Sequence, residues 1–177
     1  MRPLDWPLPT QQDIDRLTVL LDRPPVGEFV VVRRRTDGDI AVISTFPIIG
    51  RDLPMPTLFW LVDPTLVKSI STLESRGIIT WVRQNVAIEE IEASHSRYRL
   101  LRDSLIPTEY EGPRPYGGVA GTRVGFKCLH AHMAWHLAGG DDPVVKRVVE
   151  EYPNLGQELE HLAPLQLPDS IAVNLHS

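Results

Sequence analysis

The stretch EFVVVRRRTDGDIAVISTF, residues 28–46, decides the fold of this chain. Its two halves, 28–33 and 40–46, are rich in valine, isoleucine and phenylalanine, which favour strands. The tetrapeptide TDGD at 36–39 is a turn signal between them, so the stretch predicts a β-hairpin. A third run, TLFWLV at 57–62, is apolar on both faces and predicts a strand that lies centrally in the sheet or is covered.

Helical patterns surround these strands. Thr10 caps a helix that we expect to run to about residue 22, and Asp63 begins another that ends at Gly77. Further helices are predicted over 79–105 (with one break), 127–136 and 143–152. These patterns predict an α+β fold, in which a small, mainly antiparallel sheet of about three strands is covered by roughly four or five helices. We expect residues 1–152 to form this single domain and residues 153–177 to be a partly ordered C-terminal tail.

Composition narrows the class of protein. Hydrophobic residues make up 42% and charged residues 23% of the 177 positions, which is ordinary for a globular protein. The formal charge of −5 argues against general nucleic-acid binding, because phosphate contacts need concentrated positive charge. A single cysteine excludes an internal disulfide and favours a reducing compartment. With no leader-like start and no apolar run of about 20 residues, we expect a cytoplasmic protein without a membrane span.

The segment KCLHAHMAWH, residues 127–136, concentrates the reactive side chains. It holds the only cysteine, Cys128, and three of the six histidines: His130, His132 and His136. On one continuous helix, residues four apart lie above one another, so the cysteine shares a ridge with His132 and His136. His130 then lies about 200° away from Cys128 around the helix.

This segment supports two chemical hypotheses and one structural alternative. As a metal site, Cys128 with His132, or His132 with His136, would supply two ligands for zinc or iron, and the missing ligands would come from elsewhere, with Asp63, His95 and Glu109 as candidates. As a catalytic site, Cys128, His130 and His132 would supply a nucleophile and acid–base groups. Alternatively, the cysteine packs in the core and the histidines bond to backbone carbonyls. The glutamate of the HExxH zinc proteases is missing between the histidines, so a protease of that type is not indicated.

A glycine-rich stretch, YGGVAGTR at 116–123, leads into the Cys/His segment. Its glycines let backbone N–H groups approach a ligand, and basic residues near the predicted helix start add positive charge. The stretch therefore predicts a site for a small anionic ligand, formed by Gly117, Gly118, Gly121, Arg123 and Lys127. The GK[ST] ending of a P-loop is absent, so nucleotide hydrolysis is not indicated. The alternative is a flexible connection with solvated basic side chains.

Several stretches together resemble one known family. They are DRPPVG at 22–27, PTLFWLVDP at 56–64, STLESRG at 71–77, the glycine-rich stretch, and KCLHAH at 127–132 followed by LAGGDDPV at 137–144. In this order the chain, over residues 12–148, resembles the bacterial family called Domain of Unknown Function 501. The resemblance carries no established activity. Many members have a cysteine and a glycine turn where this chain has Arg35-Thr36-Asp37-Gly38, so this chain lacks that ligand if members use the cysteine to bind metal. Many also have a histidine where this chain has Trp135, whereas here a histidine stands one residue later, at His136.

Two functions stay open from the sequence. One is a pocket for a small anionic ligand, with or without a metal, where the glycine-rich stretch meets the Cys/His segment. The other is a non-catalytic interaction module that acts through a protein partner and whose cysteine and histidines are structural. The sequence does not decide whether the protein is an enzyme.

Overall fold

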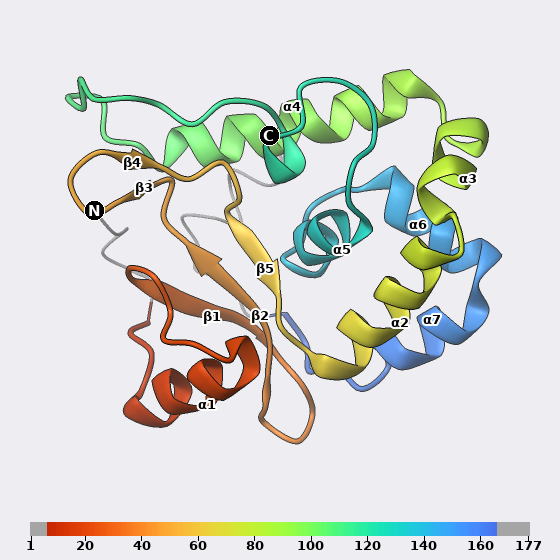
Figure 1. The fold of residues 1–177 in the computed structure, drawn as a ribbon, viewed down its shortest axis with the longest axis horizontal. Helices are drawn as coiled ribbons and strands as arrows, with labels where there is room; N and C mark the ends of the chain where they lie inside the picture. Colours follow the sequence, from red (N-terminus) through yellow and green to blue (C-terminus); the bar gives the residue numbers. More distant parts are fainter. Residues whose placement is uncertain (1–6, 166–177) are drawn as a thin grey trace.

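The structure, a computed structural model, describes residues 7–165, and its centre is an antiparallel sheet (Figure 1). The sheet has the order β1-β2-β5, with β1 at Phe29–Arg34, β2 at Ile40–Thr45 and β5 at Phe59–Leu61. The antiparallel pairing of β1 with β2 confirms the predicted hairpin. An unpredicted two-stranded sheet follows β2, formed by β3 (Ile48–Ile49) and β4 (Leu53–Pro54).

Seven α-helices accompany these strands within residues 7–165. They are α1 (Gln11–Leu21), α2 (Pro64–Ser75), α3 (Ile78–Asn85), α4 (Ile88–Ser104), α5 (Leu129–Leu137), α6 (Pro143–Glu151) and α7 (Pro153–Leu159), with a short 3₁₀ turn, η1 (Val119–Gly121), before α5. The predicted α+β class is therefore confirmed. Across the described residues, no helix combines the length and the apolar character that crossing a lipid bilayer requires.

The first two helices begin at side chains that cap them. Thr10 accepts a hydrogen bond from the N–H of Asp13, and the Asp13 carboxylate accepts one from the N–H of Thr10 at 2.9 Å. Asp63 accepts the N–H of Leu66 at 2.9 Å. Because these bonds satisfy donors that a helix leaves open at its start, they confirm the predicted beginnings of α1 and α2.

The sheet carries hydrophobic residues on both faces, and each face packs against helices. One face meets α1 through Phe29 and Ile43. The other face contributes Val42 and Phe59 to the main core, which α2 to α7 complete. Figure 1 shows this division, with α1 beside β1 and the group of α2, α5, α6 and α7 beyond β5.

An aromatic cluster joins the sheet to α4 and α5. The ring of Trp135 stacks on Phe59 at 5.7 Å between centroids and meets Tyr98 edge-on at 5.4 Å. Burial raises the pKa of Tyr98 to about 12, and its hydroxyl accepts the N–H of Leu58. Gly140 closes on the same indole, because a β-carbon at this position would overlap the ring of Trp135.

The chain after α6 folds back onto β1. The N–H of Ala163 donates to the carbonyl of Arg34 at 2.9 Å, and Nε of Arg33 donates to the carbonyl of Ala163 at 2.9 Å. Leu162 is 8% exposed and belongs to the main core. Helix α7 and these contacts give residues 153–165 a defined position, while the rest of the predicted tail, 166–177, lies outside the described residues.

Candidate functional site

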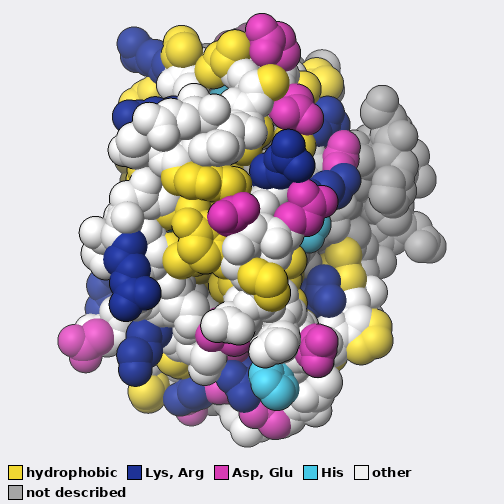
Figure 2. All heavy atoms as spheres, turned by 90° about the vertical axis from the view of Figure 1, so that its right-hand side faces the viewer, with side chains coloured by type: hydrophobic (Ala, Val, Ile, Leu, Met, Phe, Trp, Pro, Cys, Tyr) yellow, Lys and Arg dark blue, Asp and Glu magenta, His cyan; other side chains and the backbone are white. Residues whose placement is uncertain are grey.

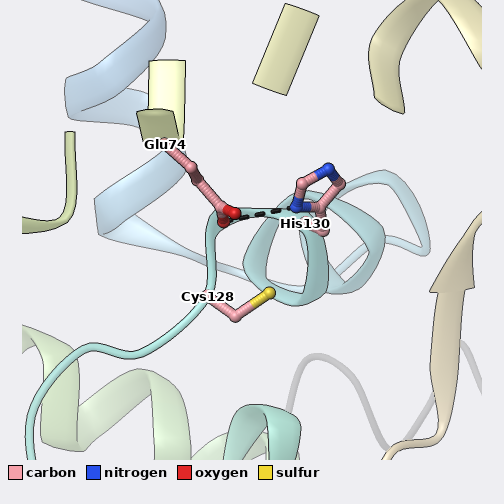
Figure 3. Close-up of side chains that lie close together, drawn as sticks. All are labelled: Glu74, Cys128 and His130. Atoms are coloured by element: carbon pink, nitrogen blue, oxygen red, sulfur yellow. Dashed lines mark ion pairs between the residues drawn. The ribbon is translucent and has the colours of Figure 1, made fainter. Parts of the chain in front are cut away.

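Helix α5 begins one residue after Cys128. Cys128 is its N-cap and has an extended backbone (φ −150°, ψ 119°), although its side chain makes no capping hydrogen bond. The prediction that Cys128 and His130 lie on opposite sides of one helix is therefore wrong, because only His130 lies in the helix. Their side chains instead point toward a common centre (Figure 3).

Glu74, from the last turn of α2, completes this centre. Its Oε1 accepts the N–H of Leu129 at 2.7 Å and lies 3.2 Å from Nδ1 of His130. A helix N-terminus attracts negative charge, because its first N–H groups have no partner within the helix. The anion at the start of α5 is thus a carboxylate of the protein itself.

The ligand atoms of Glu74, Cys128 and His130 lie within 4.8 Å of one another. The Glu74 and His130 side chains are 26% and 25% exposed, and Cys128 is half-buried. Among residues 7–165, the Glu74–Cys128–His130 group is the one place where three or more side chains of metal-binding type bring their ligand atoms this close together. The three residues can hold a metal ion.

The second ring nitrogen of His130 faces α2. Its Nε2 lies 3.2 Å from the carbonyl oxygen of Val67 and 3.2 Å from Oγ of Ser71. The Val67 carbonyl and the Glu74 carboxylate both only accept hydrogen bonds, so a protonated ring can donate to each from a different nitrogen. Loss of the Nδ1 proton would leave the Nδ1 lone pair facing Glu74 and Cys128.

Charge inside the group shifts the protonation of His130. The hydrogen bond with Cys128 contributes most, and the charge of Glu74 and the carbonyl of Val67 add to it. Together they outweigh the partial burial of the ring and raise the pKa of His130 to about 9. In the metal-free protein the ring is therefore an imidazolium at neutral pH.

His132 belongs to a separate, buried network. Its Nδ1 lies 2.7 Å from Oδ2 of Asp142, which also accepts Oγ of Ser94 at 2.9 Å. Burial acts to raise the pKa of Asp142, but the His132 charge and these hydrogen bonds outweigh it and lower that pKa. The other oxygen of Asp142 accepts the N–H groups of Val144 and Val145, so this network also caps α6.

The remaining residues of the predicted metal set have other surroundings. Asp63 is 2% exposed, caps α2 and pairs with Nη1 of Arg35 at 3.2 Å. His136 lies near the end of α5, where burial lowers its pKa and leaves Nδ1 without a hydrogen-bond partner. The structure thus brings Cys128 together with His130, whereas Asp63 and His132 are each bonded to other residues.

The glycine loop, residues 116–122, is held by its own carbonyls and by α4. The N–H of Gly118 donates to Thr122 at 2.8 Å, and the N–H of Gly121 donates to Gly118 at 3.0 Å. The fully buried Arg102 donates Nη1 to the carbonyls of Tyr116 and Gly117 at 3.2 and 2.7 Å. These amides therefore serve the loop itself in the observed conformation.

Arg123 and Lys127, the two basic residues predicted to bind an anion, follow the glycine loop in the chain. The guanidinium of Arg123 covers the ring of Tyr116, with 5.0 Å from Cζ to the ring centroid. Lys127 is exposed and immediately precedes Cys128. Neither residue lies in α5, because that helix begins later than predicted. The anion-binding role of the five residues stays a prediction.

Comparison with known proteins adds the family. Neither a curated protein nor a solved structure matches the chain significantly. The sequence profile of the family described as "Protein of unknown function (DUF501)" matches residues 31–150, which is more than half of the chain. The match spans all three residues of the Glu74–Cys128–His130 group. The chain therefore belongs to the DUF501 family.

Proposed function

We propose that this protein binds one transition-metal ion, with zinc as the best fit, at Glu74, Cys128 and His130. The convergence of their ligand atoms within 4.8 Å carries the proposal. Thiolate, imidazole and carboxylate are all zinc ligands, and the soft sulfur disfavours magnesium and calcium.

The geometry fits a tetrahedral ion after small side-chain movements. Zinc bonds of about 2.0–2.3 Å place neighbouring ligand atoms roughly 3.3–3.8 Å apart. Nδ1 of His130 and Oε1 of Glu74 are already 3.2 Å apart. The carbonyl of Val67 would hold the histidine by its other nitrogen, as the outer partners of metal-bound histidines do.

Three protein ligands leave one position of the ion open. Such sites bind water or an external ligand there, whereas structural zinc sites use all four positions for protein. We place the small anionic ligand predicted from the sequence at this open position. The partial exposure of Glu74 and His130 supports access from solvent.

Metal analysis of the purified protein tests this function. We expect about one equivalent of zinc or iron per chain after loading and gel filtration. Glu74→Gln, Cys128→Ser and His130→Gln should each weaken metal affinity at least about tenfold, as measured by chelator competition. His161→Gln and Glu160→Gln replace exposed side chains of the same types and serve as controls. No bound metal, or unchanged affinity in all three site variants, refutes the proposal.

A nucleophilic thiol is the second candidate, and the hydrogen bond between Cys128 and His130 favours it. The two candidate functions differ in how zinc affects the reactivity of the Cys128 sulfur. If Cys128 is a ligand of the metal ion, zinc should protect it from alkylation by iodoacetamide. Rapid alkylation at an equal rate with and without zinc favours the nucleophile.

A further inference from the structure

The surroundings of the Glu74–Cys128–His130 group are basic in a protein whose formal charge is −5. Lys127 immediately precedes Cys128, and Arg76 follows Glu74 by two residues at the end of α2. Both side chains are exposed, and neither forms an ion pair within the described residues. Each ligand segment of the group therefore carries an unneutralised cation beside it.

Arg83 adds a third cation, which is held in place. It extends from α3, and its Nη2 donates to the carbonyl of Phe126 at 3.0 Å, two residues before Cys128. Arg83 has no carboxylate partner within residues 7–165, so most of its N–H donors are free. In contrast, Arg16 and Arg34, on the α1 side of the sheet, pair with aspartates at 2.6 and 2.9 Å.

Figure 2, which looks onto the side of the molecule that carries α3, shows how charge is distributed there. Lysine and arginine side chains lie along its left-hand side, and others lie in the middle and at the right, where most of the acidic side chains are. The acidic residue that reaches the chain before Cys128 is Glu92, whose Oε1 accepts the N–H of Gly125 at 2.9 Å. That carboxylate is engaged by backbone rather than by Arg83 or Lys127.

Charge counting then selects the ligand. A divalent ion bound by one thiolate and one carboxylate has no net charge. The three cations Arg76, Arg83 and Lys127, less the one negative charge of Glu92, then leave a surplus of two positive charges. A phosphate group near neutral pH carries close to two negative charges and several acceptor oxygens, which match a guanidinium fork and an ammonium. A monocarboxylate would neutralise only half of the surplus.

We infer that the open position of the metal site takes the phosphate group of a small molecule, with Arg83 and Lys127 as its charged contacts. This inference rests on the proposed metal site. The positive surroundings would also raise the local concentration of such anions and speed their binding. Inorganic phosphate and phosphate esters share this chemistry, and the inference covers both.

Cobalt-substituted full-length protein allows a direct test, because the visible absorption of cobalt(II) changes when an external ligand binds. Titration with inorganic phosphate should give a saturable spectral change, and acetate should bind more weakly. Arg83→Gln and Lys127→Gln should each raise the phosphate dissociation constant about five- to tenfold while about one cobalt per chain remains bound. Arg114→Gln is the matched control, since Arg114 is also exposed and donates Nη2 to a backbone carbonyl, that of Tyr110.

The outcomes separate the two proposals. Bound cobalt with a spectrum that phosphate leaves unchanged overturns the phosphate inference and leaves the metal site intact. Equal affinity for acetate and phosphate, or unchanged phosphate affinity in both site variants, also overturns it. Absence of bound cobalt refutes the metal site itself and the inference with it.

Discussion

Raising the pH should destabilise the metal-free protein through His130. The folded-state pKa of this ring, about 9, lies above its ordinary value of 6.5, so folding favours the protonated form. A group whose pKa is higher in the folded state contributes its full stabilisation when the pH is below its unfolded-state pKa. This contribution is lost as the pH rises through the folded-state pKa. The loss should therefore fall between about pH 6.5 and pH 9.

The structure sets the size of this effect. The two pKa values differ by roughly 2.5 units, and each unit corresponds to about 1.36 kcal/mol, which gives an upper limit of about 3 kcal/mol. Because the side chain is 25% exposed, solvent screens part of the interaction. We expect a loss on the order of 1–3 kcal/mol in the free energy of unfolding.

Urea unfolding with a chelator and a reductant present measures this loss. The free energies of unfolding of wild type and His130→Gln are compared at about pH 6 and about pH 9.5. The effects of groups that titrate in both proteins then largely cancel in the difference. The stability advantage of the wild type should shrink by the expected amount, and His161→Gln should show no such change. Proton NMR of the ring gives the pKa directly, and Cys128→Ser should lower it, since the Cys128 hydrogen bond is its largest cause. A wild-type pKa near 6.5, or a constant stability difference, refutes the reasoning.

Three further predictions concern residues away from the site. Gly140→Ala should lower the free energy of unfolding by about 1–3 kcal/mol or more, because its methyl group would overlap Trp135; urea unfolding of the variant tests this. Asp142→Asn should cost about 3–5 kcal/mol in the same assay, since it removes the charge paired with the buried His132, and a loss under about 1 kcal/mol would contradict that account. Arg102→Met should leave loop carbonyls without donors, so limited proteolysis should cut the glycine loop faster while hydrogen exchange in β2 stays unchanged.

Two aspartates show which parts of the fold were predictable from sequence. Asp63 and Asp142 each precede a proline, and each proves to be the N-cap of the helix that follows. This works because a cap depends on contacts between residues two or three positions apart. The hairpin of β1 and β2 is predictable for the same reason, as its turn and strand patterns are local.

The candidate site depends on contacts that no local pattern reveals. Glu74 accepts the N–H of a residue 55 positions later, and its only signal in the sequence was its place in the STLESRG stretch. The four-residue spacing from Cys128 to the later histidines predicts that Cys128 lies in a helix, but the helix begins after it. A shift of one residue at that boundary changes which side chains meet.

The glycine loop shows a different limit of sequence reasoning. Its glycines correctly indicate an irregular, closely packed backbone: Gly118 lies against the ring of His95, where a β-carbon would not fit. The sequence could not show that the buried Arg102 takes up the loop carbonyls, because Arg102 reads as one more charged residue of a mixed helix. Tertiary contacts of this kind are set by residues far away in the sequence, so no local pattern could reveal them.

The three proposed ligands come from two separate segments, Glu74 from α2 and Cys128 with His130 from the start of α5, so occupancy of the proposed metal site depends on the native state. Once α2 and α5 separate, only a thiol and an imidazole two positions apart remain, and such a pair holds zinc weakly. An ion that binds the native chain alone shifts the unfolding equilibrium by mass action, by about 2.7 kcal/mol at a hundredfold excess over its dissociation constant. On the proposed site, removal of metal would then raise the unfolded fraction of the protein, even if the ion took no part in any reaction.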